Sequence, residues 1–399
     1  MAVRERGVVS GVLGVVAVVV VAFWVAVLSL LSLGAFAPGL GLLGDVGTAV
    51  AATTAAPFVL VGLVLVGAAA LLRRRFRRVG TALVGLGALV VVASLVISGM
   101  IWSAASTAGG SVNPFAALVP APSTRTDPDE HLVYTTTPTG QELRAAVYRP
   151  AAPGAPLAVY VHGGGWVAGS ELDRGKDMRW FADRGWLVVS VEYTLATADR
   201  PTWDVAGPQV GCALTWAAAQ APRWGADASR IALLGDSAGG QLAITNAYQA
   251  AVGQARSSCG GTVPKSSAVA VQYPAVDPRG GYAEGYAFGD SLATDTRQLG
   301  RAYFGGTPDE VPDRYQALSG ATVITPEAPP TLVISPDDDV VVPPAGVRDF
   351  ADRATRAGID TTLVELPFAN HAYDTGAQGS LGNQARLTIT ENWLRTRVG

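Results

Sequence analysis

Three long apolar stretches dominate the first hundred positions of the chain: Val9–Leu33, Val50–Leu72 and Val79–Trp102. Each is longer than the roughly 18–20 residues that a helix needs to cross a bilayer. Every backbone polar group within lipid has to be bonded inside its own segment, which favours helices. The first stretch is too long for a signal peptide, and no small-residue cleavage site follows it. The pattern therefore predicts a membrane region, residues 1–102, with three transmembrane helices.

Basic residues flank these stretches unevenly. Arg4 and Arg6 precede the first stretch, whereas the loop between the first and second carries only Asp45. The loop between the second and third contains five arginines: Arg73, Arg74, Arg75, Arg77 and Arg78. Basic loops stay in the cytoplasm. We therefore expect a multi-pass protein of the cell membrane whose chain lies outside the cytoplasm after Trp102.

The pattern changes twice after the membrane region. Residues 103–129 are rich in Ala, Ser, Thr, Gly and Pro, which is typical of a linker. From residue 130 to 399, short apolar runs alternate with amphipathic ones, which predicts a mostly parallel sheet flanked by helices. The predicted strands are His131–Thr137, Glu142–Tyr148, Leu157–Val161, Trp186–Val191, Arg230–Leu234, Ala268–Tyr273, Thr331–Ser335 and Thr361–Leu366. The predicted helices are Lys176–Arg184, Val205–Ala219, Gly239–Val252, Pro344–Ala357 and Leu381–Arg397.

One segment, Asp277–Glu327, fits this alternation poorly and is rich in Gly, Tyr and Asp. An insert at this place would lie near the carboxyl ends of the strands, where ligands bind in open α/β sheets. We interpret it as a small lid or pocket wall, although a surface excursion without influence on the substrate would show the same pattern.

Composition narrows the classes of partner. Charged residues make up 15% of the chain, against about a quarter in soluble proteins. The second half has no Lys/Arg-rich run, so nucleic acid is not expected as a partner. The two cysteines, Cys212 and Cys259, could pair in an oxidising compartment or remain separate buried thiols.

The clearest chemical pattern is Gly235-Asp236-Ser237-Ala238-Gly239, a G-x-S-x-G sequence between a predicted strand and a predicted helix. A turn this tight puts the serine in strained dihedrals with its hydroxyl projecting from the sheet, and bulkier residues at the two glycines would collide. Ser237 is therefore predicted to be a nucleophile.

A second pattern, His162-Gly163-Gly164-Gly165-Trp166, follows the predicted strand Leu157–Val161. A glycine run exposes backbone N–H groups, and fixed donors stabilise the negative oxygen that forms during acyl transfer. We assign this oxyanion role to the N–H groups of Gly164, Gly165 and Ala238.

A serine nucleophile needs a base, and the chain has three histidines. His131 begins the domain. His162 lies in the run 162–166, here called the glycine loop, and is expected to order that loop. His371 follows the predicted strand Thr361–Leu366, on the same edge of the sheet as Ser237, and is the predicted base.

An acid should hold the base in the correct tautomer. Three candidates, Asp337, Asp338 and Asp339, follow the predicted strand Thr331–Ser335. Metal catalysis is not expected, because the chain has no H-E-x-x-H, no C-x-x-C and no His pair at helical spacing. No P-loop or dinucleotide fingerprint is present, so no cofactor is expected.

At these residues the chain resembles the α/β-hydrolase superfamily, specifically its HGGG-type carboxylesterases (hormone-sensitive-lipase-like and feruloyl/acetyl-esterase-like). The resemblance covers about residue 131 to the end, and implies an α/β-hydrolase fold. The acid of that family often stands three residues before a Val-Pro pair, and Val342-Pro343 then points to Asp339. The resemblance thus implies the triad Ser237, Asp339 and His371.

Two features depart from that family. A run that is often Asp-Tyr-Arg-Leu in the family is here Glu192-Tyr193-Thr194-Leu195, so the arginine and its local ion pairs are missing. Membrane stretches and linker occupy the place of an amino-terminal cap, so no large cap is expected.

The leading hypothesis is a membrane-anchored hydrolase of small-molecule or lipid carboxylic esters that acts through an acyl-enzyme. An acyltransferase could use the same acyl-enzyme on an envelope lipid or glycan. A non-catalytic hydrolase-fold module is the third hypothesis, but such a module does not need the complete set of Ser237, Asp339, His371 and the glycine run. The acyl chain, the alcohol and the oligomeric state stay open.

Overall fold

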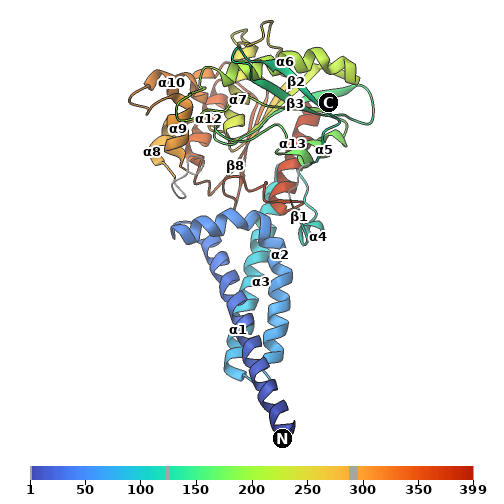
Figure 1. Cartoon of the computed structure of the whole chain (residues 1–399), viewed down its shortest axis with the longest axis vertical. Coiled ribbons are helices and arrows are strands. Elements are labelled where there is room, and N and C mark those ends of the chain that lie inside the picture. Colours follow the sequence, from blue (N-terminus) through green and yellow to red (C-terminus); the bar gives the residue numbers. More distant parts are fainter. Residues whose placement is uncertain (1, 123–125, 287–294, 399) are drawn as a thin grey trace. The chain divides into compact units, whose positions relative to one another are not determined.

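The computed structural model describes residues 2–122, 126–286 and 295–398, and Figure 1 shows its elements. The chain divides into two compact units. The first, here the helical unit, comprises Met1–Pro122 together with Leu366–Ala385. The second, here the sheet unit, comprises Ser123–Glu365 together with Arg386–Gly399. Residues 366–385, which begin at the last residue of the last predicted strand, thus belong to the helical unit.

Three long helices form the body of the helical unit: α1 (Ala2–Phe36), α2 (Leu42–Leu72) and α3 (Arg77–Thr107). Each contains one predicted transmembrane stretch, and among the described residues these three helices are long and apolar enough to cross a membrane. Their outward surface is apolar, as Leu13, Val64 and Leu89 show with more than 60% of each residue exposed. Lipid suits such a surface far better than water.

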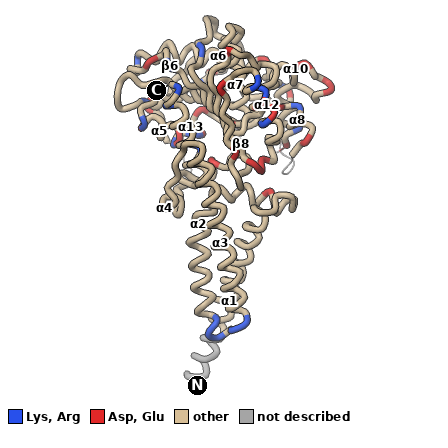
Figure 2. Tube along the Cα trace, turned by 180° about the vertical axis from the view of Figure 1, so that it is seen from behind, with Lys and Arg blue, Asp and Glu red and all other residues tan. Residues whose placement is uncertain are grey.

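Small residues let these helices approach closely. A Cβ atom added to Gly62 of α2 would lie 2.7 Å from Val91 Cγ2 of α3, and one added to Gly87 of α3 would lie 2.9 Å from Val66 Cγ2 of α2. Such small-residue contacts are typical of membrane helix pairs, which gain mainly van der Waals contact from association. The arginines of the α2–α3 connection lie at one end of the helices, shown in blue in Figure 2.

The helical unit also contains short elements outside the three helices. They are α4 (Pro114–Ala117), capped by the Asn113 side chain, and the two-residue strands β1 (Ala121–Pro122) and β10 (Ala377–Gln378). The two strands pair antiparallel. Part of the predicted linker 103–129 is therefore structured, while residues 123–125 lie outside the described residues.

An eight-stranded sheet with the order β2-β3-β5-β4-β6-β7-β8-β9 forms the centre of the sheet unit. The strands β2 and β3 are antiparallel, and β3 is antiparallel to β5. From β5 to β8 all pairs are parallel. The strands are β2 (Glu130–Thr136), β3 (Glu142–Tyr148), β4 (Ala155–Val161), β5 (Leu187–Val191), β6 (Ala226–Asp236), β7 (Ala268–Gln272), β8 (Thr331–Pro336) and β9 (Thr361–Leu366).

Helices follow the strands of this sheet (Figure 1). They are α5 (Gly175–Ala182), α6 (Ala206–Gln220), the 3₁₀ turn η1 (Ala221–Trp224), α7 (Ser237–Ala251), α12 (Pro344–Arg356) and α13 (Leu381–Val398). The strands β4, β5 and β7 are buried along their whole length, as expected for parallel strands covered on both faces. The predicted sheet with flanking helices is confirmed.

In its described residues, the predicted insert between β7 and β8 contains four short helices: α8 (Pro278–Glu284), α9 (Thr296–Phe304), α10 (Pro312–Ala317) and α11 (Gly320–Val323). Residues 287–294 of this insert lie outside the described residues. Helices α9 and α10 pack through aromatic rings, with Phe304 stacked on Tyr315 at 3.9 Å between ring centroids.

Cys212 and Cys259 form a disulfide, which decides between the two alternatives that the sequence left open. Cys212 is fully buried in α6, whereas Cys259 lies on an exposed loop after α7. The bond closes a loop with a sequence separation of 47 residues. Such a bond restricts the unfolded chain and is characteristic of oxidising compartments.

We expect Cys259→Ser to lower the free energy of unfolding of the sheet unit by about 2–4 kcal/mol, because it opens this loop without changing the buried core. Thermal unfolding of the full-length protein in detergent measures the effect. Ser258→Ala, in the same exposed loop, is the matched control. An unchanged unfolding midpoint for Cys259→Ser would contradict a stabilising disulfide.

Candidate active site

Ser237 lies where β6 passes directly into α7. Asp236 is the last residue of the strand and Ser237 is the first of the helix, with no residue between them. Ser237 has a φ of 52°, in the left-handed region that residues with a side chain rarely adopt. The predicted strained turn is therefore present, and such strain is typical of functional positions.

The two glycines of the turn are required by close backbone contacts. A Cβ atom on Gly235 would lie 2.5 Å from Gly239 O, and one on Gly239 would lie 2.2 Å from Val161 O of β4. Real Cβ atoms do not approach oxygen this closely. The G-x-S-x-G spacing therefore reflects the packing of the turn against itself and against the end of β4.

Asp236, between Gly235 and Ser237, accepts a hydrogen bond at 2.6 Å from the hydroxyl of Tyr160 in β4. Both residues are buried, and burial raises the pKa of Tyr160 well above its usual value, so the hydroxyl remains a donor. This bond ties the turn to the neighbouring strand. This role of Tyr160 was not predicted from the sequence, although a tyrosine in the middle of an apolar strand implies a polar partner.

The glycine loop follows β4, which is paired in parallel with β6 so that Val161 lies opposite Gly235. The loop and Ser237 therefore leave the sheet at the same edge. A Cβ atom on Gly163 would lie 3.3 Å from Ser237 Cβ, so the loop backbone passes beside Ser237. Gly164 and Gly165 have φ values of 104° and 60°, and Trp166 also has a positive φ of 63°.

Ala238 lies in the first turn of α7, where backbone N–H groups have no acceptor within the helix. The helix dipole adds positive potential at this end. A negative oxygen near Ser237 would therefore meet favourable donors.

His162 is held inside the fold. Its Nδ1 donates to Gly163 O at 2.7 Å, and its ring stacks on Tyr193 with 4.4 Å between ring centroids. Burial lowers the pKa of His162, which favours the neutral ring. His131 contacts Glu171, with 2.6 Å between Nε2 and Oε1. These contacts fit the expectation that His162 orders the glycine loop.

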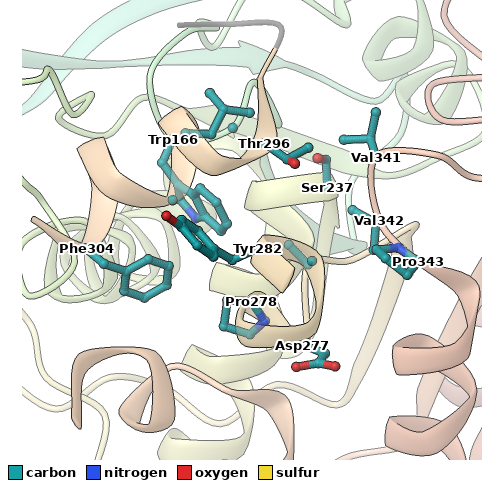
Figure 3. Close-up of a pocket in the computed structure, with 15 residues that line it drawn as sticks. Trp166, Ser237, Asp277, Pro278, Tyr282, Thr296, Phe304, Val341, Val342 and Pro343 are labelled. Atoms are coloured by element: carbon teal, nitrogen blue, oxygen red, sulfur yellow. The ribbon is translucent and has the colours of Figure 1, made fainter. Parts of the chain in front are cut away.

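Ser237 opens into a pocket with largely apolar walls (Figure 3). Trp166 forms one wall, and its ring stacks on Tyr303 with 4.4 Å between ring centroids. The insert supplies much of the remaining wall, so it contributes to the pocket as the sequence suggested. The lining residues from the insert include Pro278, Tyr282, Thr296, Leu299 and Phe304.

The loop after β8, residues 337–343, carries the three candidate aspartates and is here called the acid loop. It lies beside the same pocket, because Val341, Val342 and Pro343 line that pocket. Asp339 is buried, and its Oδ1 accepts from the N–H groups of Val341 at 2.9 Å and Val342 at 2.8 Å. Asp337, in contrast, is exposed, and its Oδ1 lies 3.9 Å from Arg348 Nη2. Burial of the three candidates thus favours Asp339.

His371 lies on the loop that follows β9, within the segment Leu366–Ala385 of the helical unit. Its backbone N–H donates to Asn370 Oδ1 at 2.7 Å. Phe368 and Ala372 have positive φ values of 56° and 58°, so the loop around His371 is conformationally constrained. The structure thus brings Ser237, Gly165 and the acid loop to one pocket, and assigns His371 to the other unit.

Across the described ranges, no group of three or more His, Cys, Asp or Glu side chains is arranged to hold a metal ion.

The chain is similar to a known protein family and to several known proteins. The BD-FAE family matches residues 146–353. The chain is 30% identical over 226 residues to esterase LipC of Mycobacterium tuberculosis, a match that covers 55% of this chain and 53% of LipC. It is 31% identical over 250 residues to ethyl acetate hydrolase of Pseudomonas putida, covering 60% of this chain and 73% of that protein. The chain thus spans only about half the length of some of the relatives that it matches.

Among solved structures, esterase 2 of Thermogutta terrifontis, phosphonylated by sarin, matches with a TM-score of 0.56 and 22% identity. The match covers 67% of this chain and 94% of that structure. The likeness shows the fold, so the predicted α/β-hydrolase fold is confirmed.

We expect Gly239→Ala to reduce the yield of folded protein, because its Cβ would overlap Val161 O. Gly207→Ala is the matched control, since no atom lies within 4 Å of a Cβ at that helical position. Folded yield by size-exclusion chromatography measures both variants. A folded yield of Gly239→Ala equal to that of the control would contradict the packing of the turn.

Proposed function

The chain belongs to the BD-FAE family of esterase-like α/β-hydrolases, and we propose on this basis that it hydrolyses carboxylic esters at the pocket beside Ser237. The observation that carries the proposal is the left-handed Ser237 at the β6–α7 turn, opening into that pocket beside the glycine loop. A binding module does not need a strained serine at this position.

In the proposed reaction, Ser237 Oγ attacks the ester carbonyl carbon while His371 takes the hydroxyl proton. The tetrahedral intermediate collapses, His371 gives the proton to the departing alcohol, and an acyl-enzyme remains. A water molecule, deprotonated by His371, then attacks the acyl-enzyme and releases the acid. Ser237 regains its proton in the last step.

The N–H groups of Gly164, Gly165 and Ala238 stabilise the negative oxygen of both tetrahedral intermediates. Support comes from the loop backbone beside Ser237 and from the position of Ala238 in the first turn of α7. Loss of one such donor typically costs about 3–4 kcal/mol of transition-state stabilisation.

Asp339 is the proposed partner of His371. Its Oδ1 is held by two backbone N–H groups, so the carboxylate has a defined orientation in a buried site. A buried carboxylate offsets the imidazolium charge more strongly than an exposed one, because water screens it less. Asp337 and Asp338, which are more exposed, are better suited to the solvent side of the loop.

The walls of the pocket favour an apolar group of the substrate. Trp166, Leu299 and Phe304 offer aromatic and aliphatic contacts, which suit an acyl chain better than a sugar or a charged acid. We propose that the acyl part of the ester lies against these residues.

We further propose that the helices anchor the protein in the cell membrane with the site outside the cytoplasm. Thr48 and Arg73 are separated by almost the full length of α2, about 37 Å at 1.5 Å rise per residue. Asn370 of the His371 loop contacts Thr48, at the end of α2 opposite the arginines. Because the basic end stays inside, the His371 loop lies on the outer side. The Cys212–Cys259 disulfide supports this orientation, because disulfides persist in oxidising compartments outside the cytoplasm.

The full-length protein in detergent should hydrolyse p-nitrophenyl esters, and Ser237→Ala should reduce kcat by about a million-fold, because the nucleophile is lost from a cooperating triad. Esters from acetate to palmitate define the acyl preference. A serine-directed fluorophosphonate probe should label the parent and not the variant. A folded parent that is inert towards every ester and towards the probe would refute the esterase proposal.

Within the same experiment, Asp339→Asn tests the choice of acid and should lower kcat by about 10⁴-fold. Asp337→Asn is its matched control, in the same loop with the same change of charge, and should stay near the parent. Equal losses in the two variants would contradict the role of Asp339.

The proposed orientation is tested with new cysteines, since both natural cysteines are paired. Thr139→Cys lies in the exposed turn between β2 and β3, and Arg75→Cys lies between α2 and α3. A membrane-impermeant maleimide should label Thr139→Cys in intact cells and Arg75→Cys only after permeabilisation. The reverse pattern would place the sheet unit in the cytoplasm.

A further inference from the structure

The loop that carries His371 is bonded to a membrane-type helix far away in the sequence. Asn370 Nδ2 donates to Thr48 Oγ1 of α2 at 2.8 Å, across a sequence separation of 322 residues. Both side chains are buried, with 2% and 1% of the residues exposed. A buried side-chain hydrogen bond is directional and costly to break, because its donor and acceptor would then be buried without water to replace the lost bond.

The bond belongs to a chain of hydrogen bonds that reaches His371 itself. Thr48 Oγ1 donates to Gly44 O at 3.0 Å, so its lone pair is available to Asn370. Asn370 then uses its amide N–H towards Thr48 and its Oδ1 to accept the backbone N–H of His371 at 2.7 Å. The amide of Asn370 is thus held at both ends, and it connects α2 to the backbone of the proposed base.

Other contacts dock the same segment on α2. Thr53 Oγ1 donates to Tyr373 O at 3.3 Å. A Cβ atom on Gly376 would lie 3.3 Å from Thr53 Oγ1, and one on Gly382 would lie 3.2 Å from Ala52 Cβ. The residues before and after His371 therefore lie against successive turns at the amino-terminal half of α2.

Further bonds hold the end of the segment to the chain that leaves α3. Gln384 Oε1 accepts from Asn113 N at 2.7 Å, and Gln384 Nε2 donates to Asn113 O at 3.2 Å. Strands β1 and β10 add a short antiparallel ladder. The segment is therefore fastened at several points to residues 44–122 of the helical unit.

We propose that Thr48 and Asn370 are positioning residues for His371, so that the membrane helices hold the catalytic base as well as anchoring the enzyme. The inference rests on the proposed function, in which His371 is the base. The loop needs such support because Phe368 and Ala372 both have left-handed backbone conformations, which persist only where surrounding contacts enforce them.

The expected effect is on the chemical step. A shift of the imidazole by about 1 Å can reduce the rate about 100-fold, because proton transfer needs close alignment. Substrate binding should change little, since Thr48 and Asn370 are not among the residues that line the pocket in the described part of the chain. A fall in kcat at nearly constant KM is therefore the signature of positioning.

The first test uses the full-length protein in lipid nanodiscs with p-nitrophenyl acetate. Thr48→Val removes the acceptor for Asn370 and should lower kcat at least about 10-fold, with KM within about twofold. Thr48→Ser restores the hydroxyl and should restore kcat. Thr54→Val is the matched control, because the Thr54 hydroxyl bonds only Val50 O of its own helix in the described contacts.

The outcomes separate the two proposals. If Thr48→Val keeps the kcat of Thr54→Val, or if Thr48→Ser fails to recover it, the positioning role is refuted while the esterase proposal stands. If the parent itself neither turns over esters nor reacts with a fluorophosphonate, the proposed function fails instead.

A second test needs no substitution in the hydrogen-bond chain. The Cβ of a residue replacing Gly376 would lie 3.9 Å from Thr53 Cβ, within the range of a disulfide. Thr53→Cys with Gly376→Cys should therefore cross-link α2 to the His371 segment. A protease site in the turn at Thr139 separates the two parts of the chain, so the cross-link is visible as an undivided band on a non-reducing gel.

The cross-linked enzyme should keep kcat within about threefold of the single-cysteine variants, because the docked segment is the active arrangement. Failure to cross-link would show that the segment does not lie on α2. A cross-linked enzyme that loses its activity would show that the segment has to leave α2 during turnover, and would overturn the proposal.

Discussion

The turn between β6 and α7 is the constraint on which the rest of the site depends. Ser237 has to be left-handed because the strand ends and the helix begins without an intervening residue, at a cost on the order of 1–3 kcal/mol. Close backbone packing at Gly235 and Gly239 and the Tyr160–Asp236 bond offset that strain. The parallel pairing of β4 with β6 then delivers the glycine loop to the same edge.

On our proposal that its helices lie in the membrane, the helical unit obeys a different constraint, because lipid gives no hydrophobic drive for helices to associate. Its contacts depend on small residues and on a few buried polar bonds. Helix α2 uses both: glycines and alanines face its neighbours, and the Thr48 hydroxyl accepts from the loop of His371. The same helix surface therefore serves helix packing and, on our proposal, the geometry of the base.

Much of the fold could be predicted because its signals are local. Buried strands such as β4 and β5 are apolar runs, interrupted in β5 by Ser190, and their observed ends differ from the predicted ends by at most two residues. Strand β6 begins at Ala226, earlier than predicted. Its first residues include the polar Asp227 and Ser229, so the apolar pattern did not indicate a strand there. The strands β1 and β10 were not predicted, since two residues form a strand only through a distant partner.

By itself the sequence determined the apolar stretches, the glycine turn around Ser237, the glycine loop and the small set of histidines, because each depends on neighbours within a few positions. Only the tertiary structure decided which of three aspartates is buried, that Cys212 pairs with Cys259, and that Tyr160 holds Asp236. It also decided that the His371 loop packs against α2. Asn370 and Thr48 are 322 residues apart, and nothing in the local pattern of either distinguishes a buried partner from a solvated side chain.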